Sequence, residues 1–221
     1  FKREAGIKSA VILSGNTSDI MRNPQNNGVY QPVLQVVIDT LRSCKYTSII
    51  KWDRVDGVDP GLSDPVILLN TPPAASYDLG DDLSDTSGSS TPAYRDPDEF
   101  FPYLLDLIRH GTGKTAFILD YSDYLFGNAN SLSEKERNYL ATLGKALQQG
   151  RSYDMLSTAE EAGNIVVLVT KNSASIPPSF YLNNPLVSTI NIPLPGHTER
   201  EMFVKTNLSL LRIDQDLTHD I

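Results

Sequence analysis

The feature that most constrains the fold is a series of short, continuous apolar runs separated by segments of helical periodicity. Residues 165–169 read Ile-Val-Val-Leu-Val, and residues 10–13 read Ala-Val-Ile-Leu. Such runs are typical of parallel strands buried on both faces, because a strand with one wet face alternates apolar and polar residues. The sequence therefore predicts an α/β fold, a three-layer sandwich with a mostly parallel sheet. Further strands are expected over residues 47–52, 115–121 and 188–193.

Between these runs, apolar residues recur every three or four positions and predict helices. Ser133 and Glu136 form a capping-box pattern at the start of one helix, and Gly111 suits the end of another. Pro32 suits the first turn of a helix, where its missing N–H is not needed. The expected helices span residues 31–43, 98–110, 133–150 and 199–211.

Composition excludes several classes of function. The 221 residues carry a net charge of -8, which disfavours binding to nucleic acid. No apolar run approaches the roughly 20 residues that span a bilayer. The single cysteine, Cys44, cannot form an internal disulfide, and the three histidines show no metal-ligand spacing. We expect a cytoplasmic domain without a membrane span and, because the chain opens with Phe1, a piece of a longer protein.

Residues 111–115, Gly-Thr-Gly-Lys-Thr, look like a phosphate-binding loop but stand in the wrong place. Such a loop follows a buried strand and opens a helix, so that its amides and the helix dipole face the phosphates. This string follows a predicted helix and precedes a predicted strand. The full pattern also needs a glycine at the position of Ile108. The sequence therefore predicts that Lys114 lies at a strand entry.

The last quarter of the chain carries a family resemblance. Val-Thr-Lys-Asn at 169–172 is followed by Ile-Pro-Pro at 176–178, by Ile-Asn-Ile-Pro-Leu-Pro at 190–195, and by Glu-Arg-Glu-Met-Phe at 199–203. This order resembles the end of the core domain of AAA-type P-loop ATPases. Phe-Ile-Leu-Asp at 117–120 then stands where that family has its Walker B strand.

The resemblance implies a domain organisation. Residues 1–198 would form a degenerate AAA-like core, with a long acidic loop at about 71–97 that is rich in Asp, Ser, Gly, Pro and Thr. Residues 199–221 would be the helical start of a lid or of a linker to a following domain. The lid itself would be largely absent.

The chain departs from the family at three catalytic positions. The phosphate-loop position holds Ser-Gly-Asn-Thr-Ser at 14–18, with one glycine and no lysine. Tyr121 replaces the second Walker B carboxylate, and Asp123 would lie on the same side of a continuing strand. The arginine expected before the last strand is missing from residues 183–187. The resemblance thus implies no catalytic residue and no metal site, only vestigial nucleotide-site positions: Ser14, Gly15, Asn16, Thr17, Asp120 and Asn172.

Two of these positions have a second interpretation. Asp120 is either an inherited magnesium-binding carboxylate or a strand-end residue bonded to nearby backbone. Asn172 is either a γ-phosphate sensor or a residue that satisfies loop amides. The residues alone leave both open.

Three functions follow as hypotheses. The preferred one is a non-hydrolysing AAA-like scaffold or protein-interaction domain, the N-terminal part of a larger AAA ATPase. It would need no cofactor and would bind a protein partner or a neighbouring ATPase domain, with a homo-oligomeric ring as one assembly. The second is a weakly active or nucleotide-binding ATPase that uses ATP and magnesium, in which Lys114, Asp120 and Asn172 converge. The third is a Rossmann-like binding module.

Overall fold

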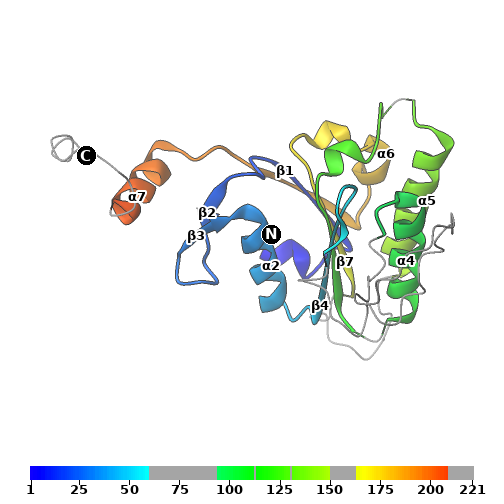
Figure 1. Ribbon diagram of the computed structural model, residues 1–221, viewed down its shortest axis with the longest axis horizontal. Helices are drawn as coiled ribbons and strands as arrows, with labels where there is room; N and C mark the ends of the chain where they lie inside the picture. Colours follow the sequence, from blue (N-terminus) through cyan, green and yellow to red (C-terminus); the bar gives the residue numbers. More distant parts are fainter. Residues whose placement is uncertain (60–93, 112, 130, 150–162, 209–221) are drawn as a thin grey trace, which may run out of the picture.

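A six-stranded sheet forms the centre of the computed structural model, which describes residues 1–59, 94–111, 113–129, 131–149 and 163–208. The strand order is β5-β4-β6-β7-β1-β8, and every pair is parallel except β4 with β5 (Figure 1). The predicted fold class is confirmed. The strands are β1 (Ala10–Gly15), β4 (Ser48–Asp53), β5 (Gly57–Val58), β6 (Thr115–Leu119), β7 (Ile165–Val169) and β8 (Val187–Ile192).

Helices cover both faces of this sheet (Figure 1). Because neighbouring strand residues point to opposite faces, Val11 and Leu13 belong to one apolar core and Ala10 and Ile12 to the other. The central strands β1, β6 and β7 are buried on both faces, which explains their continuous apolar sequences. The first core is covered by α1 (Lys2–Ala5) and α2 (Val33–Ser43), and the second by α4 (Pro97–His110), α5 (Glu134–Gln149) and α6 (Pro178–Tyr181).

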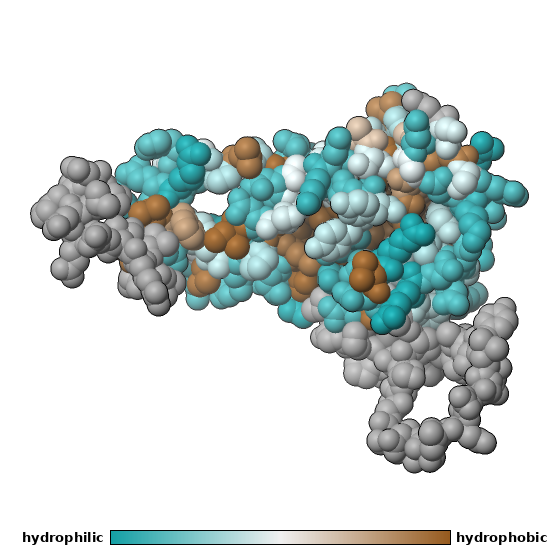
Figure 2. All heavy atoms as spheres, turned by 45° about the horizontal axis from the view of Figure 1, so that its top comes forward, coloured by the Kyte–Doolittle hydropathy of each residue, from teal (hydrophilic) through white to brown (hydrophobic). Residues whose placement is uncertain are grey.

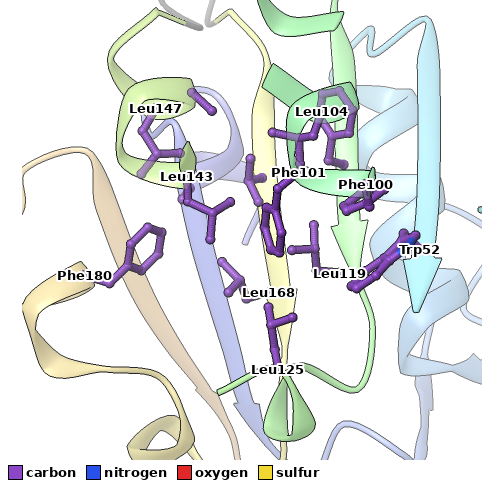
Figure 3. Packing of buried hydrophobic residues seen from close by; sticks show 14 of the residues in the cluster. Trp52, Phe100, Phe101, Leu104, Leu119, Leu125, Leu143, Leu147, Leu168 and Phe180 are labelled. Atoms are coloured by element: carbon purple, nitrogen blue, oxygen red, sulfur yellow. The ribbon is translucent and has the colours of Figure 1, made fainter. Parts of the chain in front are cut away.

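An aromatic stack joins the sheet to α4 (Figure 3). The rings of Trp52 and Phe100 lie 4.3 Å apart between centroids and 9° from parallel. The indole N–H of Trp52 donates a hydrogen bond to the carbonyl of Tyr94 at 2.5 Å. Both rings are fully buried, so this contact fixes the place of α4 on the sheet.

The ends of the helices follow the expected capping chemistry. The Asp96 side chain accepts a hydrogen bond from the Asp98 amide at the start of α4, and the Gly111 amide donates to the Leu107 carbonyl at its end. At α5, the Ser133 amide donates to Glu136 and the Glu136 amide donates to the Ser133 hydroxyl, which confirms the predicted capping box.

The chain between β1 and α2 forms a hairpin that the sequence did not predict. Its strands are β2 (Ile20–Arg22) and β3 (Tyr30–Pro32), which pair antiparallel. The prediction that a helix begins at residue 31 was therefore wrong: Pro32 ends β3 and is the N-cap of α2.

The last described helix, α7 (His197–Asn207), lies beside this hairpin and away from the main body (Figure 1). The rings of Tyr30 and Phe203 meet edge to face at 4.9 Å. Within the described ranges, no helix is long and apolar enough to cross a membrane. Most of the predicted acidic loop, residues 71–93, and the end of the predicted last helix fall outside those ranges.

Candidate functional site

The carboxyl ends of β1, β6 and β7 meet at one edge of the sheet, where α/β folds bind ligands. A cavity of about 210 Å³ lies there, and Thr17 and Asp120 both line it. The structure thus brings these two predicted positions together, whereas Ser14 and Gly15 belong to β1 itself. The cavity is lined by Thr17, Ser18, Asp19, Pro32, Leu34, Asp120, Tyr121, Asp123, Val169 and Lys171.

Lys114 lies at the opposite edge of the sheet. It precedes β6, whereas Asp120 follows β6, so a five-residue strand at about 3.3 Å per residue separates them. The Lys114 ammonium donates to the Cys44 carbonyl at 3.2 Å and sits over the Tyr46 ring, 4.6 Å from its centroid. Lys114 is a strand-entry residue, and the convergence with Asp120 that the ATPase hypothesis requires does not occur.

At the end of β1 and in the loop after it, three amides that a phosphate loop would offer are bonded to protein carbonyls. The Gly15 amide donates to the Lys171 carbonyl at 3.1 Å, and the Asn16 amide donates to the Ile192 carbonyl at 2.9 Å. The Thr17 amide donates to the Gly15 carbonyl at 2.8 Å. A phosphate cradle needs such amides free and convergent. Here they close the loop onto the neighbouring strands.

Gly15 is required by strand packing. Its φ is +97°, and a Cβ placed there would lie 2.5 Å from the Ile192 carbonyl oxygen. Only glycine allows this approach of β1 to β8. Two of the residues at the predicted phosphate-loop position, Ser14 and Gly15, are therefore part of β1.

The first amide of α2 is also bonded to protein. Pro32, its N-cap, has no N–H, and the Val33 amide donates to the Asp19 carbonyl at 3.0 Å. The hairpin separates this helix end from β1, whereas a phosphate loop runs directly from strand to helix.

Asp120 shares one cation with a second carboxylate. The Lys51 ammonium lies 3.8 Å from an oxygen of Asp120 and 3.8 Å from one of Asp53. Burial raises the pKa of Asp120, and the hydrogen bond from the Tyr121 amide and the charge of Lys51 oppose that rise only in part. Across the described ranges, no three carboxylate, histidine or cysteine side chains cluster in a way that could hold a metal ion.

The chain turns sharply after Asp120. Tyr121 adopts a left-handed conformation with φ 51°, and its side chain is 56% exposed. The prediction that Asp123 continues the strand beside Tyr121 was therefore wrong, since β6 ends at Leu119 and Asp123 lies in a short 3-10 helix, Ser122–Tyr124.

Asp123 instead organises the loop after β7. Its carboxylate accepts hydrogen bonds from the Thr170 hydroxyl at 2.5 Å, from the Lys171 amide at 2.8 Å and from the Asn172 amide at 3.2 Å. Burial alone would raise the pKa of Asp123, but these bonds together with one from Ser175 hold it below its usual value. Apart from the carboxylate itself, nothing in the sequence predicts this role.

Asn172 is engaged in the same loop. Its side-chain oxygen accepts a hydrogen bond from the Ala174 amide at 3.0 Å and so caps a second 3-10 helix, Ser173–Ser175. A polar side chain at a strand end commonly does this.

The residues present do not fit the phosphates of ATP. Those phosphates require free amides, a glycine-rich approach and a lysine. The cavity instead presents three carboxylates, Asp19, Asp120 and Asp123, against one cation, Lys171.

No curated protein matches the sequence. One solved structure, "Structure of E. coli MS115-1 HORMA:CdnC:Trip13 complex", contains a chain that is 10% identical, with a TM-score of 0.49. The match covers 95% of the present chain but 56% of that chain, so the present chain spans little more than half of its length. Over residues 1–193 the sequence matches the family described as "AAA+ chaperone, N-terminal Rossmann-like domain", and the chain belongs to that family.

Proposed function

We propose that the chain is a protein-interaction domain of a larger AAA+ chaperone and does not itself hydrolyse ATP. The observation that carries this proposal is the closed loop after β1. The amides of Gly15, Asn16 and Thr17 are bonded to protein carbonyls, so a phosphate could enter only if these bonds broke.

The vestigial positions take structural roles in this proposal. Gly15 allows β1 to approach β8, Asp120 pairs with Lys51, and Asn172 caps the loop after β7. Nucleotide chemistry would belong to another module of the parent protein, and this domain would bind a protein partner or that module, in a ring if the parent forms one. The single cysteine agrees with a cytoplasmic setting.

The first experiment is calorimetric titration of the purified domain with ATP and with ADP, each in the presence of magnesium. We expect no binding at micromolar concentrations. Micromolar binding would overturn the proposal.

A matched pair of lysine variants locates any binding that is found. Lys171 lines the cavity at the carboxyl edge, whereas Lys114 lies at the opposite edge. Binding that Lys171→Ala weakens and Lys114→Ala leaves unchanged would place the nucleotide in the cavity and overturn the proposal. Near-ultraviolet circular dichroism checks that the unmodified domain is folded. If this folded domain gives no heat of binding, the result supports the proposal of an interaction domain.

The interaction role is tested in the parent protein. Removal of this domain should leave the ATPase rate per active site within about twofold. It should abolish capture of the partner or assembly with the adjacent module, measured by sedimentation. Loss of ATPase activity with assembly intact would contradict the proposal.

A further inference from the structure

A groove of about 580 Å³ lies between the β2–β3 hairpin, the end of β8 and α7. We call it the hairpin–α7 groove. Its walls are mainly apolar, and Figure 2 shows hydrophobic residues exposed between the α7 end of the molecule and its main body. Its volume falls within the range of roughly 300–1,000 Å³ that is usual for binding sites.

The side chains that line this groove are of the kinds that protein interfaces favour. Interfaces are enriched in aromatic residues, methionine and arginine, and depleted in lysine, serine, alanine and carboxylates. The described lining has two of each favoured kind and no lysine, serine or alanine. Because the whole chain has only three methionines, two in one groove is a marked concentration. The favoured set is Tyr30, Phe203, Met21, Met202, Arg22 and Arg200.

The walls of the groove leave apolar surface in contact with solvent. No residue of α7 is buried, and all three residues of β2 are exposed. Ile20 and Met202 are each 44% exposed. A helix of this length and a two-stranded hairpin are each marginal in water unless an apolar face is covered. A partner that covered this surface would therefore stabilise both walls.

The two carboxylates that line the groove are engaged within the chain. One oxygen of Asp19 accepts a hydrogen bond from the Asn16 side chain at 2.6 Å, and the other accepts from the Ile20 amide at 2.8 Å. Glu199 accepts from the Gly196 amide at 2.8 Å, at the start of α7. These carboxylates therefore serve local structure.

The two arginines that line the groove are the charges left for a partner. The chain has 27 acidic residues against 19 lysines and arginines, yet neither Arg22 nor Arg200 forms an ion pair with a described residue. Arg22 donates only a long contact of 3.9 Å to the Met202 sulfur. Guanidinium groups suit the two-pronged recognition of carboxylates.

We propose that the hairpin–α7 groove binds a segment of a partner protein in which carboxylates flank large apolar side chains. This inference rests on the proposed role as an interaction domain and adds the chemistry of the partner. The apolar side chains would cover Ile20 and Met202, and the carboxylates would pair with Arg22 and Arg200. A second copy that presented the same groove would oppose arginine to arginine, which disfavours that occupant.

Selection from a random peptide library tests the chemistry of the partner on the full chain. The displayed peptides have about sixteen residues, enough for a short helix or an extended segment. We expect the unmodified chain to enrich Asp and Glu together with large apolar residues. The double variant Arg22→Glu and Arg200→Glu should instead enrich Lys and Arg with the same apolar residues. The control double variant, Arg3→Glu and Arg109→Glu, reverses two exposed arginines outside the groove and should keep the acidic preference.

Titration of the best selected peptide then measures the contribution of the arginines. With a fluorescein label and anisotropy as the readout, reversal of Arg22 and Arg200 should weaken binding at least about tenfold, whereas the control variant should stay within about twofold. The same peptide with each acidic residue replaced by lysine should recover binding to the groove variant. Hydrogen exchange locates the complex, because the bound peptide should slow exchange at residues 20–32 and 197–207.

Each outcome decides the proposal. Acidic apolar peptides that protect both walls and follow the charge reversal support it. Enrichment of basic or uncharged peptides, protection elsewhere, or no enrichment overturns it. Dimers of the chain alone, seen by sedimentation and lost on Met21→Asp, overturn it in favour of a second copy. A failed selection on a chain that binds no ATP overturns this inference alone, whereas micromolar ATP binding overturns the proposed function.

Discussion

The Asp123 carboxylate accepts a hydrogen bond from the Thr170 hydroxyl at 2.5 Å and thereby ties the segment after β6 to the end of β7. The same carboxylate holds the amides of Lys171 and Asn172. Asp123, three residues beyond the Walker-B-like Asp120, is thus held by the hydrogen bonds that shape this loop. To act as a base on an attacking water, the Asp123 carboxylate would have to release several of these hydrogen bonds at once.

Replacing this carboxylate should weaken the fold. Asp123→Asn keeps one acceptor oxygen but loses the charge, and we expect the free energy of unfolding to fall by about 1–3 kcal/mol, the range for hydrogen bonds to charged groups. Urea unfolding measures the change. Asp56→Asn, an exposed aspartate in the loop after β4, should change stability by less than about 0.5 kcal/mol. Equal effects of the two variants would contradict the role assigned to Asp123.

The same residue should leave a signature in the pH dependence of stability. Its pKa is lowered in the folded state, because the hydrogen bonds from Thr170 and the loop amides outweigh the effect of burial. The unfolded chain then binds the proton more tightly than the folded chain does. The stabilisation by the Asp123 carboxylate is therefore complete above a pH of about 4 and is lost as the pH falls through the folded pKa. Between pH 7 and pH 3, the melting temperature of Asp123→Asn should fall less than that of the unmodified chain.

Asp120 should behave in the opposite way. Burial raises its pKa, so its charged form is disfavoured in the folded state at neutral pH. We expect Asp120→Asn to raise the melting temperature at pH 7, with the difference shrinking as the pH falls through the raised folded pKa and vanishing below about 4, where the carboxyl is protonated in both states. Lys51 keeps Asp53 as a partner in this variant. A lower melting temperature at pH 7 would show that the ion pair with Lys51 outweighs burial.

Two glycines make a matched test of backbone packing. Gly15→Ala would bring its Cβ to 2.5 Å from the Ile192 oxygen at a positive φ, and we expect it to cost about 2–4 kcal/mol of stability. Gly144→Ala lies within α5 with nothing inside 4 Å of its Cβ, and it should stabilise by about 0.5–1 kcal/mol. Chemical unfolding of both variants measures the contrast. A neutral Gly15→Ala would sink the assignment of this glycine to strand packing.

The aromatic stack gives a spectroscopic prediction, because Trp52 is the only tryptophan in the chain. Phe100→Ala should cost about 3–5 kcal/mol and shift the tryptophan emission to longer wavelength as the stacked ring is removed. Tyr124→Ala, at a 68% exposed position, should do neither. Phe100→Leu retains apolar volume and serves if the alanine variant does not fold.

The sequence predicted those parts of the fold that have strong local signals. β7 is uniformly buried, and its five apolar residues were visible as a strand without any tertiary information. The capping box of Ser133 and Glu136 marked the start of α5 for the same reason. The sequence also predicted that Lys114 lies at the entry to β6, because Gly111 suits the end of the helix before it.

The parts that were missed depend on contacts between distant segments. The strands of the hairpin are three residues long and none of their residues is buried, so neither apolar alternation nor length distinguished them from a loop. The left-handed turn at Tyr121 decided where β6 ends, and a tyrosine gives no sign of such a turn. The role of Asp123 could not be predicted, since its partners lie 47 to 52 residues away in the chain.

The hairpin also limits how this domain could change over evolution. Residues 16–32 stand between β1 and α2, where a phosphate loop would pass from strand to helix without interruption. Placing a lysine and glycines in that stretch would leave the helix start displaced from the strand. A direct passage from β1 into α2 would require deletion of the hairpin, whose Tyr30 also packs against Phe203 of α7. Point substitutions alone would not turn this stretch into a phosphate loop, because the start of α2 would remain separated from the end of β1.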